Sequence, residues 1–555
     1  MNASTRTPYT KPPRHWKILA DHACVTPDIL SYDFKGNGTV AQPYIVEWAP
    51  HDARNPQQWS KLYKWIVALT VAFATLAVSF CSSAYSGGLR GVMQTFGVSE
   101  EVATLGLSLF VLGFALGPLL WAPLSELYGR QRVFFITFAA FTAFNAGASE
   151  AQNVQTLLIL RFLAGSFGSS PLTNAGGVIA DLFDAKERGL AMSLFSLTPF
   201  LGPVLGPVVG GFLGETEGWR WIGRLMTIFS GFLWILGTAI VPETYAPVLL
   251  RSRASKLSKI TGKVYYTKHD IDRGPLTVGE IIQTNLIRPW MLLFREPIVL
   301  IFSVYLAIIY GILYMLFGAF PIVYQQERGW SQGIAGLPFL AVAIGMVLAV
   351  VYSVLIEQPR YLRAVKAYHG FAPPEARLPA TAVGALALPV GLFWHAWTNS
   401  PSVPWPASVA AAIPFGFGMV LVFIGVLSYL IDAYTMYAAS ALAANTVLRS
   451  LFGAAFPLFT RQMFDKLGIH WAPSLAGFLA LACLPFPLLF YKYGKQIRLK
   501  SKYAAEADAF MVGLRARMQT AASQRTETAG ASAAPTIDLS DGTSGKVEKD
   551  ALEEA

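Results

Sequence analysis

Twelve apolar stretches recur along this chain of 555 residues, and each is long enough to cross a lipid bilayer as a helix. A helix needs about 20 predominantly apolar residues to cross the hydrocarbon core. The composition agrees, because 54% of the residues are apolar and 14% are charged, whereas a soluble domain carries roughly 25% charged residues. Disorder, a collagen-like fibre and a nucleic-acid-binding globule are therefore excluded. The apolar runs are continuous rather than alternating, which excludes a β-barrel.

The twelve stretches fall into two groups of six, separated by a polar segment. They cover residues 64–84, 102–121, 133–149, 156–181, 189–213 and 221–241, then 296–319, 334–356, 378–398, 405–430, 437–460 and 471–491. We therefore predict an all-α polytopic membrane protein with 12 transmembrane helices in two six-helix halves, each built of inverted three-helix units. The predicted parts are a cytosolic N-terminal tail (1–63), an N-terminal bundle (64–241), a cytosolic linker (242–295), a C-terminal bundle (296–492) and a cytosolic, largely disordered tail (493–555).

The distribution of basic residues predicts the orientation of these helices. We number the connections between consecutive predicted helices from the first to the eleventh, the sixth being the linker. The other even-numbered connections together carry eight Lys or Arg residues, and the odd-numbered connections carry five. The linker and both tails are also rich in these residues, and the whole chain has a net charge of +10. Cytosolic loops of membrane proteins carry an excess of Lys and Arg. Both termini and the linker are therefore predicted to lie in the cytosol.

The sequence offers no site for an energy-rich cofactor. It contains no phosphate-binding loop of the form Gly-x4-Gly-Lys-Ser/Thr, which argues against an ATP-driven pump. Its 7 histidines and 3 cysteines are scattered, without the spacing of a metal site. We therefore expect no metal, no cofactor and no enzymatic activity, which leaves an ion gradient or facilitated diffusion.

The connection between the second and third predicted helices concentrates charge at the cytosolic membrane edge. It contains Glu126, Gly129, Arg130 and Arg132. Glu126 can pair with Arg130 or Arg132, and also with the positive N-terminal end of a neighbouring helix. Such a cluster can latch one conformation and release it in another. The alternative is that the basic residues only anchor the loop at the membrane surface.

An arginine inside a membrane helix is energetically unfavourable, so we expect such a residue to have a function. Arg161 lies in the fourth predicted helix, which also contains Gly165, Gly168 and other small residues that allow helices to pack closely. The alternative is that its long side chain reaches the outer interface of the membrane.

The fifth predicted helix carries glycine and proline at regular spacing. Gly202, Gly206 and Gly210 recur every four residues and lie on one face, where another helix can contact the backbone. Pro203 and Pro207 each remove a backbone hydrogen bond and permit bending. A close-packed face that bends fits a helix that moves during alternating access. A merely kinked packing helix is the alternative.

These three segments resemble signatures of the major facilitator superfamily. The loop keeps Leu124, an acid, Gly129 and Arg130 of the pattern G-x-L-a-D-r-x-G-r-k. By this resemblance, Glu126 and Arg130 lock the outward-facing state against the start of the eleventh helix, near Asp432. Arg161 with Gly165 resembles a second signature, Arg-x-x-x-Gly, which implies a role for Arg161 in proton handling.

The fifth helix is the most specific match to this family. It fits the pattern g-x-x-x-G-P-x-x-G-G at Gly202, Gly206, Pro207, Gly210 and Gly211, and that pattern is typical of antiporters. Short segments at 55–60, 218–221 and 242–245 resemble the fungal branch of twelve-span drug:proton antiporters. The resemblance implies the major facilitator fold and proton-driven export of drugs or metabolites.

A proton-coupled carrier needs a titratable group in or near its pathway. The first predicted helix contains no acid, and the candidate carboxylates Glu126, Asp181, Glu243 and Asp432 all lie near cytosolic ends of helices. We predict that Asp181 and Glu126 share the latch, and that protonation of one of them weakens it. Proton coupling is thus assigned to Arg161 and Asp181.

The candidate substrate contacts are Asn174, Tyr310, Tyr314, Asn445 and Arg449. The two tyrosines are four residues apart, as are Asn445 and Arg449, so each pair faces one direction. Arg449 is again costly in the middle of a membrane helix, which indicates a cavity for an anionic or polar group. For the two tyrosines, a packing or lipid-facing surface is an equal alternative.

The leading prediction is a secondary active transporter that exports small amphipathic molecules, such as drugs, toxins or secondary metabolites, by proton antiport. An uptake symporter or facilitator for a nutrient or organic acid is the nearest alternative. A membrane enzyme or a transport-dead receptor is an alternative of a different class. Only a measurement of substrate flux distinguishes such a receptor from a transporter. The expected partners are the substrate, protons and the lipid bilayer, without nucleic acid, and a monomer is expected to suffice. The plasma membrane is the expected location, with the vacuole or another organelle as the alternative.

Overall fold

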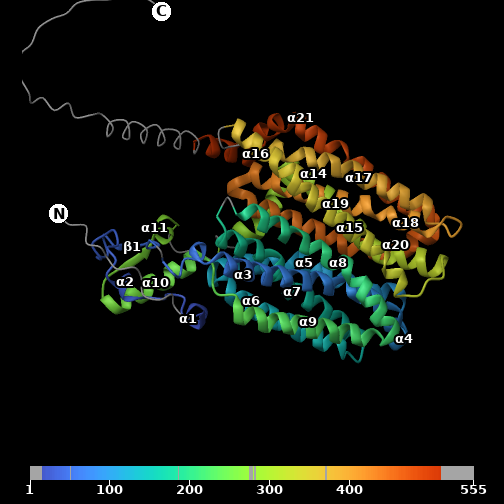
Figure 1. Cartoon of the computed structure of the whole chain (residues 1–555), viewed down its shortest axis with the longest axis horizontal. Coiled ribbons are helices and arrows are strands. Elements are labelled where there is room, and N and C mark those ends of the chain that lie inside the picture. The colour runs from blue at the N-terminus through green and yellow to red at the C-terminus, as the bar shows by residue number, and fades with distance from the viewer. Residues whose placement is uncertain are drawn as a thin grey trace, which may run out of the picture.

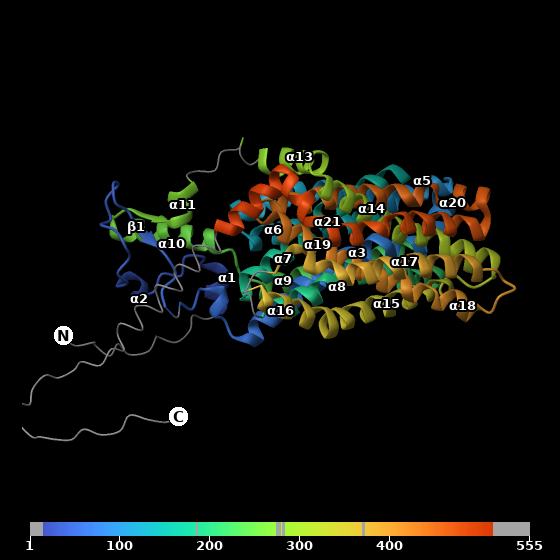
Figure 2. The ribbon, with the colours of Figure 1, turned by 90° about the horizontal axis from the view of Figure 1, so that it is seen from above.

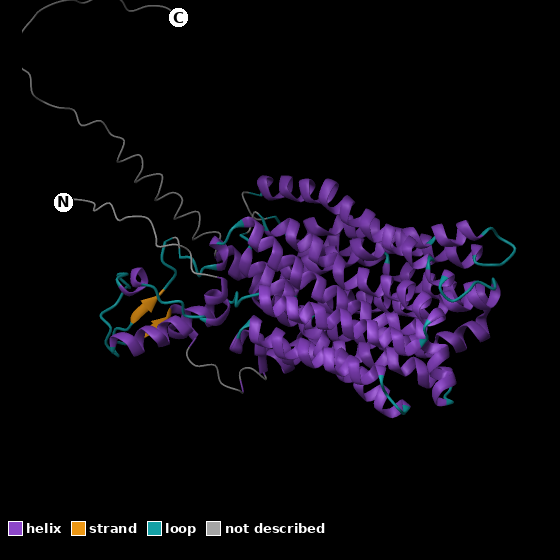
Figure 3. Ribbon diagram, turned by 60° about the horizontal axis from the view of Figure 1, so that its bottom comes forward, coloured by secondary structure: helices purple, strands orange, loops and turns teal. Residues whose placement is uncertain are grey.

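The computed structural model describes residues 15–50, 52–184, 187–273, 279, 283–368 and 372–513. Long helices that run side by side form one elongated bundle (Figure 1, Figure 2). A small segment with two short strands lies beyond one end of this bundle (Figure 3). We call that end of the bundle the proximal end. The opposite end, near α4 (Leu89–Phe96) and α18 (Trp405–Ala410), is the distal end (Figure 1).

Six long helices form the N-terminal half. They are α3 (Lys61–Ala84), α5 (Glu100–Tyr128), α6 (Arg130–Ser149), α7 (Val154–Leu182), α8 (Arg188–Thr216) and α9 (Trp219–Ile240). Ser60, Ser99 and Asn153 each accept a hydrogen bond from a backbone N–H three residues on, which satisfies a free donor where α3, α5 and α7 begin. Gly129, with φ of 99°, makes the tight turn from α5 to α6 in a conformation that other residues rarely adopt.

The C-terminal half repeats this plan. Its long helices are α14 (Pro297–Phe320), α15 (Pro338–Tyr352), α17 (Leu378–Thr398), α19 (Ala412–Tyr434), α20 (Ala438–Cys483) and α21 (Pro485–Lys500). Shorter elements are η4 (Pro321–Glu327), η5 (Ile334–Gly336), η6 (Ser353–Glu357) and α16 (Gln358–Ala367). Gly468, with φ of 76° and ψ of 174°, interrupts α20. The element called α20 is therefore two helices that meet at a kink, as the two predicted stretches 437–460 and 471–491 require.

Eight segments of the described residues are long and apolar enough to cross a membrane. One of them, Trp405–Lys500, contains 96 residues and includes α18, α19, α20 and α21, so it holds more than one crossing. The helices α6 and α7, of 20 and 29 residues, fall outside these eight. The all-α class is confirmed, and the number twelve stays a prediction.

The two halves pack against each other along their lengths. Within the halves, α3 packs on α8, α5 on α7, and α14 on α20. Between the halves, α5 packs on α20 and α8 packs on α15. These four helices therefore form the interface on which any pathway between the halves depends.

Hydrogen bonds close this interface at the distal end. Glu215 of α8 accepts from Ser331 Oγ at 3.0 Å and from the backbone N–H of Gly333 at 2.7 Å. The side chain of Gln332 donates to the carbonyl of Gly87 and, at 3.3 Å, to that of Gly211. The described residues thus place one connection of the C-terminal half across the ends of α3 and α8.

The predicted N-terminal tail and linker fold together at the proximal end. The elements are α1 (His15–Ala20), α2 (Pro27–Leu30) and β1 (Tyr44–Val46) from the tail, with α10 (Ala246–Thr261), β2 (Tyr265–Thr267) and α11 (Lys268–Arg273) from the linker. Strands β1 and β2 pair in parallel. A small core joins the two segments and consists of Ile29, Phe34, Val46, Ala49, Ala254 and Leu257. We call residues 21–54 with 243–273 the tail–linker domain.

Buried charges join the tail and the linker within this domain. Arg253 forms a buried ion pair with Asp52. Arg54 donates to the backbone carbonyl of Glu243 at 3.0 Å. Burial lowers the pKa of Arg54 to about 10, which still leaves it protonated at neutral pH. The tail is therefore held close to Glu243, where α9 has ended and α10 has not yet begun.

Candidate transport site

Arg449 lies on α20, which packs against α5 of the other half. Its guanidinium carbon is 4.9 Å from the ring centre of Tyr310 and 5.6 Å from that of Phe423. The side chain is half-buried, and its Nε atom is buried without a hydrogen-bond partner. Tyr310 and Tyr314 are the titratable groups that interact electrostatically with the guanidinium, and no described carboxylate pairs with it. The positive charge therefore faces aromatic rings rather than an acid.

A chain of hydroxyl groups links this arginine's surroundings to the N-terminal half. Tyr310 Oη donates to Tyr314 Oη at 3.4 Å, and Tyr314 Oη shares a hydrogen bond of 2.8 Å with Ser82 Oγ of α3. Beside this chain, the rings of Phe200 and Phe423 lie 4.5 Å apart across the interface of the halves. The site is therefore shared by both halves.

Several buried polar atoms near Arg449 have no partner. Asn445 lies one turn before Arg449 and is 1% exposed, yet neither its Oδ1 nor its Nδ2 forms a hydrogen bond. Ser450 Oγ is also buried and without a partner. Buried polar groups in proteins are nearly always hydrogen-bonded, so these exceptions require an explanation. We call Ser82, Tyr310, Tyr314, Phe423, Asn445 and Arg449 the central cluster.

Arg161 is held quite differently within the N-terminal half. It is 1% exposed and donates to the carbonyls of Gly106, Cys81 and Ser82 at 3.0, 3.1 and 3.2 Å. The rings of Tyr85 and Phe110 also lie 4.6 and 4.4 Å from its guanidinium. The side chain therefore does not reach the membrane surface, which was the alternative from the sequence.

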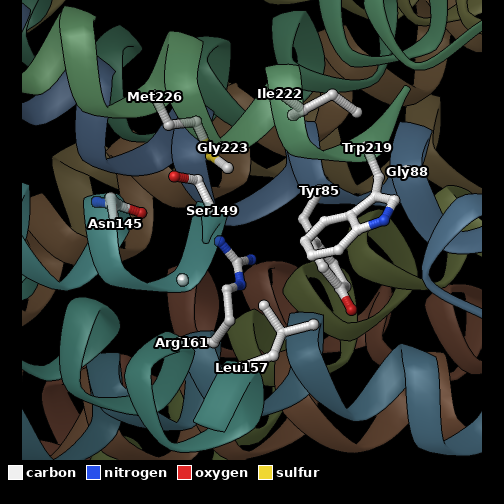
Figure 4. A pocket seen from close by; sticks show the side chains of 11 residues that line it. Tyr85, Gly88, Asn145, Ser149, Leu157, Arg161, Trp219, Ile222, Gly223 and Met226 are labelled. Atoms are coloured by element: carbon white, nitrogen blue, oxygen red, sulfur yellow. The ribbon is translucent and has the colours of Figure 1, made fainter. Parts of the chain in front are cut away.

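A small pocket lies on the other side of the same guanidinium. Figure 4 shows Arg161 in the middle of it, with Asn145 and Ser149 to one side and Tyr85 and Trp219 to the other. Asn145 is 1% exposed, and its Oδ1 has no hydrogen-bond partner. All of these residues belong to the N-terminal half, and Arg161 connects the pocket to the central cluster through the carbonyl of Ser82.

Arg130 is the centre of a cluster at the proximal end of the N-terminal half. Its guanidinium lies 3.7 Å from Asp181 and donates to Ser125 Oγ at 2.6 Å. The carboxylate of Glu243 accepts from the backbone N–H groups of Arg130 and Gln131 at 3.0 and 3.1 Å, so it occupies the positive N-terminus of α6. Two carboxylates from distant parts of the chain thus meet at this arginine.

The predicted pairing of Glu126 with Arg130 or Arg132 is not formed in this structure. Gly129 turns the chain between α5 and α6, and the side chains of Glu126 and Arg132 are exposed. Glu243 takes the position at the N-terminus of α6 that was predicted for Glu126, and Asp181 supplies the ion pair. Sequence reasoning named Glu243 as a candidate acid but gave it no role.

Two further predicted residues lie away from their expected partners. Asp432 pairs with Arg377 at 2.9 Å, within the C-terminal half, and not with the Arg130 loop. Asn174, a candidate substrate contact, accepts from Arg130 at 3.4 Å and donates to Ser170 Oγ at 3.1 Å. Both polar atoms of Asn174 are therefore used in the proximal cluster, while Tyr310, Tyr314, Asn445 and Arg449 belong to the central cluster.

The glycine face of α8 is covered by α3, as the spacing predicts. A Cβ atom at Gly202, Gly206 or Gly210 would lie 2.7 Å or less from atoms of α3. Next to this face, a Cβ at Gly211 would lie 2.9 Å from the carbonyl of Gln332 in the C-terminal half. Pro207 also meets that half, because its carbonyl would lie 2.7 Å from a Cβ at Gly336. Helix α8 therefore contacts both α3 and the connection of the C-terminal half that closes the distal end.

Sequence reasoning missed Glu215, Gln332, Phe200 and Phe423, which join the halves at the distal end and beside Arg449. Glu215 and Gln332 sit at helix ends, where polar residues are common, so no local pattern distinguishes them. The two phenylalanines lie in apolar stretches rich in other phenylalanines. Only the packing of one half on the other reveals these four.

Comparison with known proteins agrees with this architecture. Residues 71–457 match the sequence profile of the family described as Major Facilitator Superfamily. The MFS-type efflux pump MFS2 of Trichophyton rubrum is 61% identical over 497 residues, which cover 90% of this chain and 83% of that protein. The Major facilitator superfamily multidrug transporter mdrA of Aspergillus fumigatus is 59% identical over 513 residues, with 92% and 84% covered.

Solved structures agree in fold. The xylose transporter XylE from E. coli, in a partially occluded inward open conformation, aligns with a TM-score of 0.55 at 18% identity and covers 78% of this chain and 98% of its own. At this identity the likeness supports the fold alone. The relatives, the profile match and the two packed six-helix halves confirm the resemblance seen in the sequence: this chain belongs to the Major Facilitator Superfamily, whose members carry small molecules across membranes.

Proposed function

We propose that this chain exports small amphipathic molecules, such as drugs or secondary metabolites, by proton antiport with alternating access. The observation that carries the proposal is the central cluster, which unites unpartnered polar atoms and aromatic rings at the interface of the halves. Ligand sites of such transporters lie near the middle of the membrane, between the repeats. The names of the relatives, an efflux pump and a multidrug transporter, support export over uptake.

The membrane arrangement is part of the same proposal. Twelve helices cross the membrane, both termini and the tail–linker domain lie in the cytosol, and the protein works as a monomer in the plasma membrane. The excess of basic residues in the proximal connections supports this orientation. With the proximal end in the cytosol, the hydrogen bonds of Glu215 and Gln332 close the outer end of the pathway.

The proton-sensitive element in this proposal is the Arg130 cluster. Asp181 lies 3.7 Å from Arg130, at the edge of the bundle, where a proton from solution can reach it. Protonation of Asp181 removes the negative partner of Arg130 and weakens the cluster. The proximal ends of the helices then become free to change their packing. Arg161, fixed by three carbonyls, serves in this scheme as a rigid charge beside the pathway.

Export from cells tests the proposal. The chain is expressed in a yeast strain that lacks its own efflux pumps, and loss of fluorescent and radiolabelled compounds is followed with and without a protonophore. Export that the protonophore abolishes is the expected result. If the compounds equilibrate across the membrane whether or not the protonophore is present, proton coupling is contradicted and a facilitator is indicated. Accumulation in place of loss contradicts export and indicates uptake.

A further inference from the structure

Arg449, which is half-buried, differs from the arginines that the structure buries fully. Arg54, Arg161, Arg253 and Arg498 are each at most 4% exposed, and each donates to carbonyl or carboxylate oxygens. Arg449 reaches the interface of the halves, and its side chain, unlike those four, forms no hydrogen bond or ion pair with any described residue. Asp432, which lies on α19 before α20 begins, is not a partner either, because Arg377 engages it. The positive charge at the centre of the molecule is therefore not neutralised by the protein.

The surroundings of this charge are arranged for a ligand with two different parts. On one side, Tyr310 and Phe423 offer aromatic faces within 5.6 Å of the guanidinium. One turn away, Asn445 offers an unpartnered donor and an unpartnered acceptor. Because Asn445 and Arg449 are four residues apart on one helix, both present their polar groups to the same side.

A carboxylate is the chemical group that fits this charge. In a medium of low dielectric constant, an unpaired guanidinium is unfavourable and attracts an anion strongly. Its planar fork matches the two oxygens of a carboxylate, with which it forms two parallel hydrogen bonds. The flat rings beside it suit an apolar, preferably aromatic body attached to that carboxylate. A cation, by contrast, would meet like charge here.

We propose that the export substrates of this transporter are small amphipathic carboxylic acids, bound as anions with the carboxylate on Arg449 and Asn445. This inference rests on the proposed export function and narrows it to one substrate class. The apolar body of the acid packs against the rings of Tyr310 and Phe423, which contact each other with centres 6.4 Å apart. Because Tyr310 is linked through Tyr314 to Ser82 of the other half, a bound acid changes the interactions of both halves.

The test compares acids with their uncharged analogues. Binding of radiolabelled benzoate and 1-naphthoate to the purified full-length chain in detergent is measured at pH 7.5, with benzamide and 1-naphthamide as competitors of the same shape. The acids are expected to bind at least about tenfold more tightly than the amides, the difference expected for a lost charge-assisted hydrogen bond. Arg449→Met is expected to reduce acid binding to the level of the amides, and Arg449→Lys is expected to fall between.

Arg461→Met is the matched control. Arg461 lies on the same α20 at the distal surface, where it pairs with Asp465. Its replacement removes the same charge from the same element and is expected to leave acid binding unchanged. Amides that compete as well as the acids, or acid binding that persists in Arg449→Met, would overturn the inference.

A second measurement separates this inference from the export function. The same cells and variants are tested for protonophore-sensitive export of the neutral amides and of rhodamine 6G, a cationic dye. If the unaltered chain exports these compounds but neither binds nor exports the acids, the export function stands and the substrate class is wrong. If it exports nothing, the export function itself is wrong. If the Arg449→Met variant loses export of acids and of neutral compounds to the same extent, Arg449 supports the fold and does not recognise the carboxylate.

Discussion

Two arginines within long apolar helices, one in each half, have different surroundings. Arg161 donates to three backbone carbonyls, whereas Arg449 has aromatic rings beside it and an Nε without a partner. Both guanidinium groups are unfavourable inside a bilayer, but only the first is compensated by hydrogen bonds within its own half. The same residue type is thus a fixed part of one half and a ligand-facing group in the other.

The difference has a local cause. Arg161 meets α3 close to its end at Ala84, where the last carbonyls of a helix have no partner within the helix. These carbonyls also carry the partial negative charge of the helix C-terminus, which favours a cation. Arg449 lies in an uninterrupted part of α20, and its side chain meets rings of α14 and α19 instead of a helix end.

The strongest test of this comparison replaces each arginine by Met. Arg161→Met leaves the end carbonyls of α3 without their donor, and each buried group left unsatisfied costs about 1–3 kcal/mol. We expect the Tm of the purified protein to fall by more than about 5 °C and export of every substrate to be lost. Arg449→Met is expected to change Tm by less than about 2 °C. Equal losses of Tm in the two variants would contradict the division into a fixed and a ligand-facing arginine.

The next test acts on the same end of α3 from its other side. A Cβ at Gly210 would lie 2.2 Å from the carbonyl oxygen of Ala84, which is backbone and cannot rotate away. Gly210→Ala is therefore expected to separate α8 from α3 and to destabilise the protein by about 1–3 kcal/mol, seen as a lower Tm and reduced export.

Gly176→Ala is the matched control, because its Cβ would lie 3.7 Å from the nearest side chain, an ordinary contact. Export and Tm in this variant are expected to stay as in the parent protein. A tolerated alanine at Gly210 would mean that α3 and α8 are not held together through this face.

Parts of this comparison follow from the sequence, and parts do not. The long helices and the glycine face of α8 arise from patterns within about 30 residues, such as apolar runs and a four-residue repeat, so they were predictable. Arg161 and Arg449 were predictable as unusual residues because charge is rare in apolar runs. Their different partners were not, since the carbonyls that hold Arg161 belong to the backbone, which no sequence pattern marks.

Contacts between distant segments were also beyond the sequence. Strands β1 and β2 are only three residues each and come from the predicted tail and linker, so neither carries a pattern of its own. The partner of Arg130 was sought at Glu126, the nearest acid along the chain. The turn at Gly129 places Glu126 on an exposed surface, while Asp181 comes from α7 and Glu243 from the connection between α9 and α10.

A third arginine, Arg130, extends the comparison because it does have an acidic partner. If protonation of Asp181 weakens the proximal cluster, Asp181→Asn mimics the protonated form at all pH values. We expect export to fall by about threefold at neutral pH, the effect of a modest ion pair, and to lose most of its dependence on pH. Surface level, measured by labelling, is expected to stay unchanged.

Asp465→Asn provides the control for this substitution, since Asp465 pairs with Arg461 at the exposed distal surface. It is expected to leave the pH profile as it was. An Asp181→Asn variant with an unaltered pH dependence of export would remove Asp181 from proton coupling and leave the Arg130 cluster with a packing role.

The smallest expected effect concerns the hydroxyl chain that ties the central cluster to α3. Tyr314→Phe removes the 2.8 Å hydrogen bond to Ser82, which is worth about 1 kcal/mol. Ser82→Ala removes the same bond, and each substitution also removes a second one, from Tyr310 or to the carbonyl of Ser79. The two substitutions together should therefore lower Tm by less than the sum of their single effects. Tyr305→Phe is the control on the same α14, since the Tyr305 hydroxyl is buried without a partner. Its effect should simply add to that of Ser82→Ala. If Tyr314→Phe and Ser82→Ala were additive, the two halves would not communicate through this bond, and the ligand-facing half would be joined to the fixed half by aromatic packing alone.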